Sequence, residues 1–288
     1  MPTRRLLTSE LLKVRKRWLP YILFAVMSLG AAFQVWVVGF VSWKYDDAEY
    51  AAEALRGFAL PWSLVTLLDA GQFWGSFFVG VLAASVIATE HNWGTVRQAI
   101  ARGQPRSQYL TVKLLATVVL SSAGLLLALL FGVIMSIIAT MVAGEPVTLA
   151  VPDGPSAAEV PLMVLRAGYA IVPYGMLAFC LTVVSRSTTL GVVGSFIYLI
   201  MESILVAILN GLGGPAPTIN SLLLGHNVAA LLAANTIGSG AYNAMAFRDN
   251  SFSSDTPHPA AATLVIAIYC LIFLVIAYQV FRRRDLSN

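Results

Sequence analysis

Charged residues are scarce in this chain. Only 11% of the 288 residues are Asp, Glu, Lys or Arg, whereas soluble domains carry roughly 25%. The hydrophobic fraction is 58% and the mean hydropathy is +0.78. So few charges cannot cover the surface of a water-soluble globule of this length, so most of the chain must face lipid or other helices. The composition predicts a polytopic membrane protein.

Cysteine, histidine and lysine are also rare. Cys180 and Cys270 both lie in apolar runs, which argues against a disulfide framework. The histidines, His91, His226 and His258, are spread over both predicted faces of the membrane, so we expect no metal site within one chain. None of the four lysines follows a glycine, which excludes a GxxxxGK[ST] phosphate-binding loop. The chain is therefore not expected to hydrolyse ATP by itself.

Six apolar stretches are long enough to cross a membrane as helices, which need about 20 residues for a hydrocarbon core of roughly 30 Å. They are residues 19–41, 64–89, 114–142, 161–185, 189–210 and 260–281. Each is continuously apolar rather than alternating, which favours helices over barrel strands. The third is longer than a span requires, which predicts tilt or an extension into water. The expected fold is all-α, with residues 1–288 forming one transmembrane domain.

The positive charges predict the orientation of these spans. Fourteen of the 18 lysines and arginines fall in residues 1–18, 97–113, 186 and 282–284, which the six spans place on one side. Basic loops stay in the cytoplasm. We therefore expect a multi-pass membrane protein with both termini cytoplasmic, and an uncleaved first span.

The segment 211–259 is the longest predicted external loop. Its middle part, 219–237, is apolar but contains Asn220, His226, Asn227 and Asn235. A seventh span there would place the C-terminal arginines on the outer side. We therefore expect a re-entrant helical segment, with one or two short helices that dip into the outer face, after a chain break at the glycines and prolines of 211–217.

The N-terminal segment, 3–18, is amphipathic. Leu7, Leu11, Val14 and Trp18 recur at helical spacing, while most of the basic residues lie elsewhere. This pattern is typical of an interfacial helix held by anionic lipid headgroups, with Trp18 at the boundary.

The loop at 90–106, after the second span, is basic and has its own helix signals. Thr95 can cap a short helix through Ile100 and Ala101, and residues 103–105, Gly-Gln-Pro, end it. A short capped helix between two spans predicts a rigid knob on the cytoplasmic surface. A simple positive-inside loop remains the alternative.

This loop resembles that of the permease subunits of ABC-2 type ABC exporters, especially bacterial antibiotic-export and sodium-export permeases. That family shows a glutamate, then Gly-Thr-x-Arg, a short helix, a Gly-x-x-Arg step and a lysine that opens the next span. The corresponding residues here are Glu90, Gly94, Thr95, Arg97, Gly103, Arg106 and Lys113. The opening residues 9–15, Ser-Glu-Leu-Leu-Lys-Val-Arg, also look like the family's N-terminal helix, and the expected topology matches over the whole chain.

The resemblance implies a division of labour between subunits. A separate cytoplasmic ATPase subunit would bind ATP and Mg, and this chain would carry no cofactor and bind no nucleic acid. The loop would act as a coupling helix seated on that ATPase, with Glu90, Trp93, Gly94, Thr95, Arg97, Gln98, Gly103 and Arg106 as the contact residues. A second permease copy or a paralogue would complete a dimer in the membrane lipid. The cargo is left open.

Three ionisable residues fall inside the predicted spans. Asp69, Arg166 and Glu202 lie at similar depths below the outer face, and membrane-buried charges are costly unless they are paired or wetted. We expect Arg166 to pair with Glu202 or Asp69 and so to fix helix packing. The functional alternative is that a carboxylate faces an outward cavity and meets a cationic amphiphile.

Small residues cluster near the start of the fifth span. Gly191, Gly194 and Ser195 favour close contact between helices. Only a short turn at Arg186 separates the fourth and fifth spans, which are therefore expected to be antiparallel neighbours.

Two other classes of function are alternatives to an exporter subunit. An intramembrane protease is disfavoured, because residues 238–240, Gly-Ser-Gly, lie in the predicted external loop and no His-Glu-x-x-His is present. A non-transporting scaffold or sensor built on the same fold remains open, since a coupling helix could bind an ATPase without cargo moving.

Overall fold

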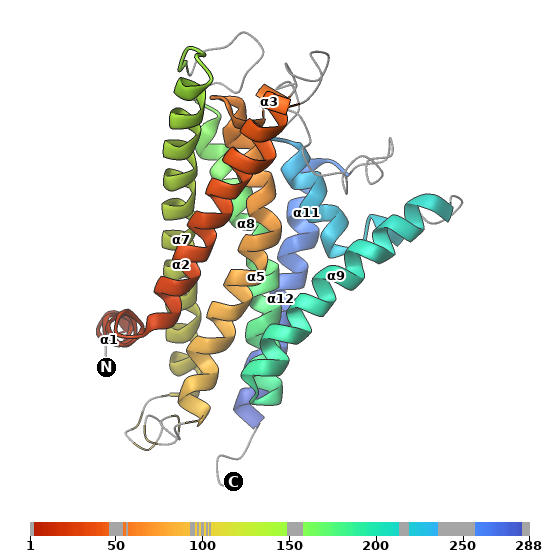
Figure 1. Cartoon of the computed structure of the whole chain (residues 1–288). Coiled ribbons are helices and arrows are strands. Elements are labelled where there is room, and N and C mark those ends of the chain that lie inside the picture. Colours follow the sequence, from red (N-terminus) through yellow and green to blue (C-terminus); the bar gives the residue numbers. More distant parts are fainter. Residues whose placement is uncertain are drawn as a thin grey trace.

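The computed structural model describes residues 3–45, 54–55, 57–92, 96, 98, 101, 103, 105–148, 158–212, 219–235 and 257–283. Within these residues the chain forms helices and no strand (Figure 1). The elements are α1 (Thr3–Arg15), α2 (Trp18–Phe33), the π-helix η1 (Gln34–Val41), α3 (Ser42–Tyr45), α5 (Trp62–Asn92), α7 (Arg106–Val142), α8 (Val160–Ser185), α9 (Thr188–Leu212), α11 (Leu224–Ala233) and α12 (Pro259–Arg283).

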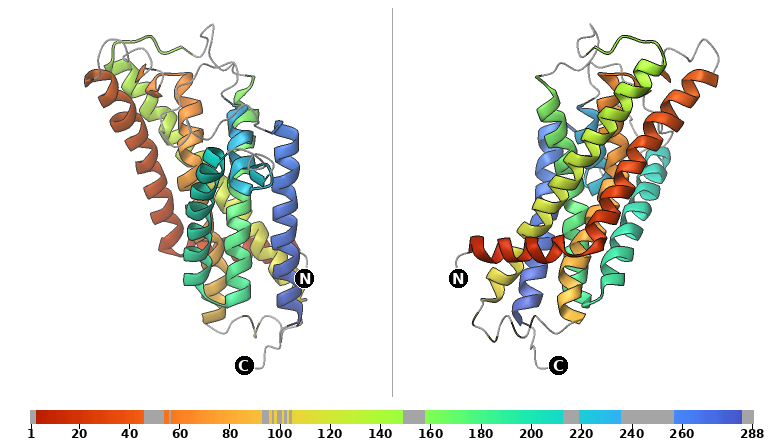
Figure 2. Two further views of the ribbon diagram at one scale, coloured as in Figure 1. Left: turned by 90° about the vertical axis from the view of Figure 1, so that its right-hand side faces the viewer. Right: turned by 60° about the vertical axis from the view of Figure 1, so that its left-hand side comes forward.

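Six helical segments are long and apolar enough to span a membrane, which confirms the predicted number. They are Trp18–Tyr45, Trp62–Thr89, Arg106–Val142, Val160–Ser185, Thr188–Leu209 and Pro259–Arg283. The third begins at Arg106 rather than at residue 114, and its 37 residues make a rod of about 55 Å. This helix runs obliquely across the bundle (Figure 2), and the predicted tilt or extension into water stays a prediction.

Helix α8 lies at the centre of the bundle and packs against α5, α9 and α12. Small residues on its buried faces, such as Ala170 and Ala178, allow these helices to approach closely. α7 and α2 pack together on the other side of α5. Figure 2 shows α1 lying nearly perpendicular to this bundle, with both termini towards the same end.

The predicted close packing of the fifth span is confirmed at Gly191. A Cβ there would collide with the Thr182 side chain and would lie 3.1 Å from both Ala178 O and Ala84 Cβ. Arg186 adopts a left-handed conformation (φ 58°) between α8 and α9, and its N–H donates to Thr182 O at 2.9 Å. The two helices are therefore the antiparallel neighbours that the short turn predicts.

The first span contains a feature that the sequence did not reveal. Its second half contains η1, a π-helix of eight residues, and π-helices of this length are rare. At Gly39 a side chain would be excluded, because a Cβ would lie 2.7 Å from that of Phe58. The aromatic rings of Phe40 and Trp43 pack against the same phenylalanine, which holds the span in this conformation.

The apolar part of segment 211–259 forms a short helix, as predicted. α11 has ten residues, too few to cross a bilayer, and it packs against α8, α9 and α12 (Figure 1). Its face towards the bundle is buried, including Leu224 and Val228. Residues 213–218 and 236–256 lie outside the described part of the chain, so the structure bears on the predicted loop only at 211–212, 219–235 and 257–259.

Candidate functional site

The N-terminal helix α1 lies against the start of α7. Its predicted apolar face is partly confirmed, since Val14 is buried and Leu7 and Leu11 are half-buried, whereas Trp18 is 82% exposed. The same face carries Glu10, which follows Leu7 by three residues and is itself buried. A carboxylate in this position needs a partner within the protein.

Lys113 of α7 is that partner. Its ammonium group forms an ion pair with Glu10 Oε2, and Lys13 of α1 donates to Glu10 Oε1 at 2.6 Å. The Lys113 side chain is only 2% exposed, and its Nζ lies 5.5 Å from the centroid of the Tyr109 ring. A buried pair of this kind fixes the position of both helices, because removing one partner leaves the other charge uncompensated. α1 is thus attached to α7 at a defined register.

The first turns of α7 are also attached to the end of α12. Arg106 donates from its guanidinium to Arg282 O at 2.8 Å, and the ring of Tyr109 stacks on Phe281 at 5.7 Å. One turn later, Thr111 Oγ1 and the Tyr278 hydroxyl share a hydrogen bond of 2.5 Å. These contacts make the beginning of the third span and the end of the sixth one structural unit.

The predicted coupling loop connects to this unit at Val96. Its side chain is 3% exposed and packs in a cluster with Ile87, Tyr109 and Phe281. Gly103 has a φ of +83°, a conformation that glycine adopts without cost, so the loop turns there before α7 begins. Gln98 is exposed to solvent.

Other predicted features of the loop lie outside the described residues. They are Trp93, Gly94, Thr95 and Arg97, the Thr95-capped helix, and the side chain of Glu90. Nearby, Arg17 donates to Thr89 Oγ1 at 3.2 Å and so joins the entry to the first span to the end of the second. The described ends of α1, α5, α7 and α12 therefore surround the place where the loop leaves and re-enters the bundle.

The membrane-embedded charges do not form the predicted pair. Arg166 donates to Ala234 O at 3.0 Å and to Asn235 Oδ1 at 3.2 Å, and within the described residues it forms no ion pair with Asp69 or Glu202. Its guanidinium thus lies at the C-terminal end of α11. The prediction was wrong because it paired charges by depth alone, and α11 supplies backbone and amide oxygens at the same depth.

Glu202 lies at the opposite end of α11. The side chain is 5% exposed, and Tyr198 donates to its Oε1 at 3.2 Å. The backbone amides of Leu224 and Gly225 lie beside the carboxylate, although Oε2 forms no hydrogen bond of normal geometry with a described residue. A Cβ on Gly225 would lie 3.1 Å from Oε2, so glycine permits this close approach.

Glu202 and Arg166 thus lie at opposite ends of α11, and each charge lies at the end that the helix dipole favours. The carboxylate lies at the N-terminus, where backbone amides carry partial positive charge, and the guanidinium lies at the C-terminus. The sequence identified both charges but did not reveal that both lie at the ends of α11. Its only indication of α11 was an apolar segment between two loops. Asp69 is half-buried on α5, and its contact with a translocation path stays a prediction.

The fold and these contacts define the class of this protein as a helical membrane protein with six candidate spans and an N-terminal helix that lies across the direction of the bundle. Residues 24–287 match a family described as "Protein of unknown function (DUF2705)". The chain belongs to that family. It is also 26% identical over 243 residues to the "Uncharacterized protein YhcI" of Bacillus subtilis strain 168, an alignment that covers 79% of this chain and 69% of the relative.

Proposed function

We propose that this protein is the membrane-spanning permease subunit of an ATP-driven ABC exporter of the ABC-2 type. It forms the translocation path and couples to a separate cytoplasmic ATPase subunit through the loop after the second span. ATP and Mg bind to that ATPase. A second permease copy or a paralogue completes the path in the bacterial plasma membrane, with both termini in the cytoplasm.

One observation carries the proposal. The two parts of the chain that resemble the exporter permeases, residues 9–15 and 90–113, are far apart in sequence but meet through the Glu10–Lys113 ion pair. A helix that only rests on lipid needs no buried carboxylate, whereas the buried ion pair holds α1 to the start of the third span, because breaking such a pair is costly.

The geometry also provides a route for force from the loop. Val96 ties the loop to a cluster that includes residues of α5, α7 and α12, and Glu10 extends this unit to α1. An ATPase that binds the loop differently with and without ATP would shift these helices together, because these contacts join them into one unit that can move as a rigid body. The expected result is a change of access in the attached spans.

The proposal is tested by co-purification from gently solubilised native membranes. The parent is compared with a variant in which Gly94, Thr95 and Arg97 are replaced by alanine. The control variant is Arg283→Ala, which removes a basic residue at the same end of the bundle but outside the loop. We expect an ATPase subunit with the parent and the control variant only. An ATPase that is absent from all three samples, or equally present in all three, contradicts the coupling role. If the ATPase binds through the loop but no cargo moves in any transport assay, the scaffold or sensor function replaces transport.

A further inference from the structure

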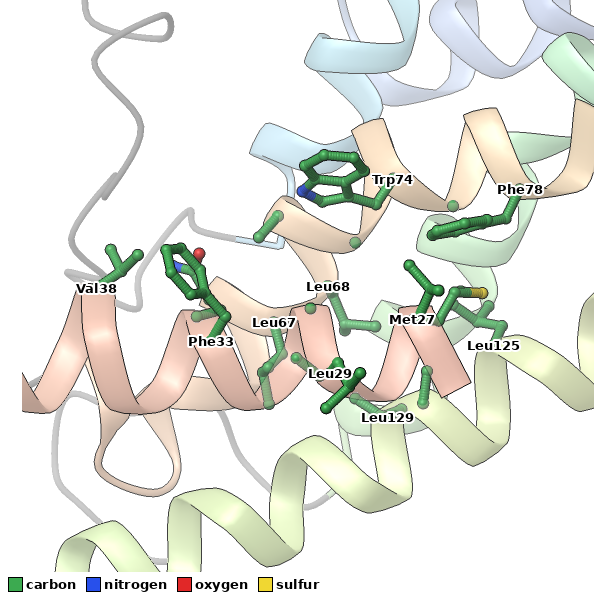
Figure 3. Close-up of a pocket in the computed structure, with 18 residues that line it drawn as sticks. Met27, Leu29, Phe33, Val38, Leu67, Leu68, Trp74, Phe78, Leu125 and Leu129 are labelled. Atoms are coloured by element: carbon green, nitrogen blue, oxygen red, sulfur yellow. The ribbon is translucent and has the colours of Figure 1, made fainter. Parts of the chain in front are cut away.

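A cavity of about 640 Å³ lies between α2 with η1, α5 and α7 (Figure 3). Its walls are almost entirely apolar, with Leu29 and Phe33 from α2, Leu67 and Trp74 from α5, and Leu129 from α7. Sites for small organic ligands commonly have volumes of about 300–1,000 Å³. The space is therefore large enough to hold a ligand.

The cavity is open to the side of the bundle rather than sealed inside it. Leu29, Phe33 and Trp74 line it and yet keep exposed fractions of 66%, 58% and 50%. All three lie within candidate membrane spans, so the medium that reaches them is the hydrocarbon of the bilayer. An occupant that enters here comes from the lipid phase.

The length of the cavity matches one leaflet. Its lining on the first span runs from Val26 to Val38, a distance of about 18 Å at 1.5 Å per residue. Half of a hydrocarbon core of roughly 30 Å is about 15 Å. An extended acyl chain can therefore lie along α2 within this groove.

Gln34 adds one polar group to the apolar walls. It lines the cavity, is 6% exposed, and forms no side-chain hydrogen bond with any residue that the structure describes. Buried amides are normally hydrogen-bonded, because leaving them unpaired in an apolar medium is costly. Its amide is thus available to a ligand that carries a hydrogen-bond acceptor or donor.

We propose that this cavity binds one acyl chain of a membrane lipid, with its ester carbonyl accepting a hydrogen bond from the Gln34 amide. The chain lies along α2 between α5 and α7. This inference does not depend on an ATPase partner, so it can fail or succeed independently of the exporter function.

Two glycines allow the cavity to be filled without disturbing its walls. Gly30 and Gly71 both line it, and an added Cβ at either position would meet nothing within 4 Å. Gly71→Leu and Gly30→Leu therefore occupy the space from opposite sides. Ala32→Leu is the matched control, since it adds bulk to α2 at a position that does not line the cavity.

The experiment uses the full chain in vesicles that contain a phospholipid with a diazirine in its acyl chain. After illumination, labelled residues are mapped by mass spectrometry, and lipid retained by the purified chain is counted by native mass spectrometry. We expect labels at cavity residues and one retained lipid for the parent and Ala32→Leu. Both signals should fall about tenfold or more in the two glycine variants, whose thermal stability serves as the folding control.

Gln34→Leu separates the polar contact from the apolar one. Losing one hydrogen bond should weaken lipid retention about 3- to 10-fold, while retention of a diazirine alkane without an ester stays the same. Unchanged labelling in both glycine variants would mean that the labels come from lipid around the protein and not from a chain inside the cavity, and would overturn the proposal. Crosslinks from the cavity to a second copy of the chain would overturn it too, because the groove would then be a dimer contact.

Discussion

Glu10 and Lys113 illustrate how single residues decide the position of a whole helix here. In a chain with so few charges, each buried ionisable group needs a defined partner, and two of these partners come from segments about a hundred residues apart. The pair is also more informative than the surface arginines, because exposed charges near lipid headgroups tolerate many positions, whereas a buried pair tolerates one.

Replacing Lys113 by methionine should detach or destabilise α1. Breaking a buried pair costs about 3–5 kcal/mol, so we expect a lower unfolding temperature in detergent and faster proteolysis between α1 and α2. The double variant Glu10→Leu with Lys113→Met should recover most of this loss, because no unpaired charge remains. Equal stability of the parent and the single variant would contradict the attachment.

Replacing Glu202 by glutamine should loosen α11. The change removes a negative charge next to the amides of Leu224 and Gly225, an interaction worth up to about 2 kcal/mol in buried geometries. Hydrogen exchange at residues 224–233 should therefore become about tenfold faster. Tyr198→Phe removes only the hydrogen bond to Oε1 and should have a smaller effect in the same direction. Slower or unchanged exchange in Glu202→Gln would count against the bracketing of α11.

At the scale of elements, the contact between α8 and α9 depends on the absence of a side chain at Gly191. Gly191→Ala should destabilise the protein by about 1–3 kcal/mol, because the added methyl group overpacks against Thr182 and Ala84. Gly30→Ala is the matched control, since its Cβ meets nothing within 4 Å, and it should be neutral or slightly stabilising. Thermal unfolding in the same detergent compares the two. An equal loss of stability in both variants would show that the effect of alanine on the helix itself, and not the contact at Gly191, decides the result.

The first span and α11 show what sequence patterns can and cannot predict about elements. Apolar length predicts a spanning helix over the first span, but the π-helical form of η1 depends on Gly39 packing against Phe58 from the next segment. The apolar length at 219–237 predicts a short helix, but not which groups hold its ends. In both cases the deciding contacts come from residues distant in sequence, and no local pattern encodes them.

At the scale of the whole molecule, the predicted orientation has a direct test. In a chain whose Cys180 and Cys270 are replaced by alanine, a single cysteine is introduced at Gln98 or at Thr148, both of which are exposed. A membrane-impermeant thiol reagent added to intact cells should label Thr148→Cys at once and Gln98→Cys only after permeabilisation, because the basic loop is predicted to face the cytoplasm. The reverse labelling pattern would show that the predicted orientation is wrong and that a cytoplasmic ATPase cannot reach the loop.

The sequence alone determined that this protein is a helical membrane protein with six spans, a short helix between the last two, and an amphipathic N-terminal segment. These properties follow from hydropathy and length, which act locally. The tertiary structure decided that Glu10 pairs with Lys113, that Arg166 and Glu202 hold α11 instead of each other, and that α2, α5 and α7 enclose a cavity. Each of these depends on which helix faces which, and packing between distant segments sets that choice.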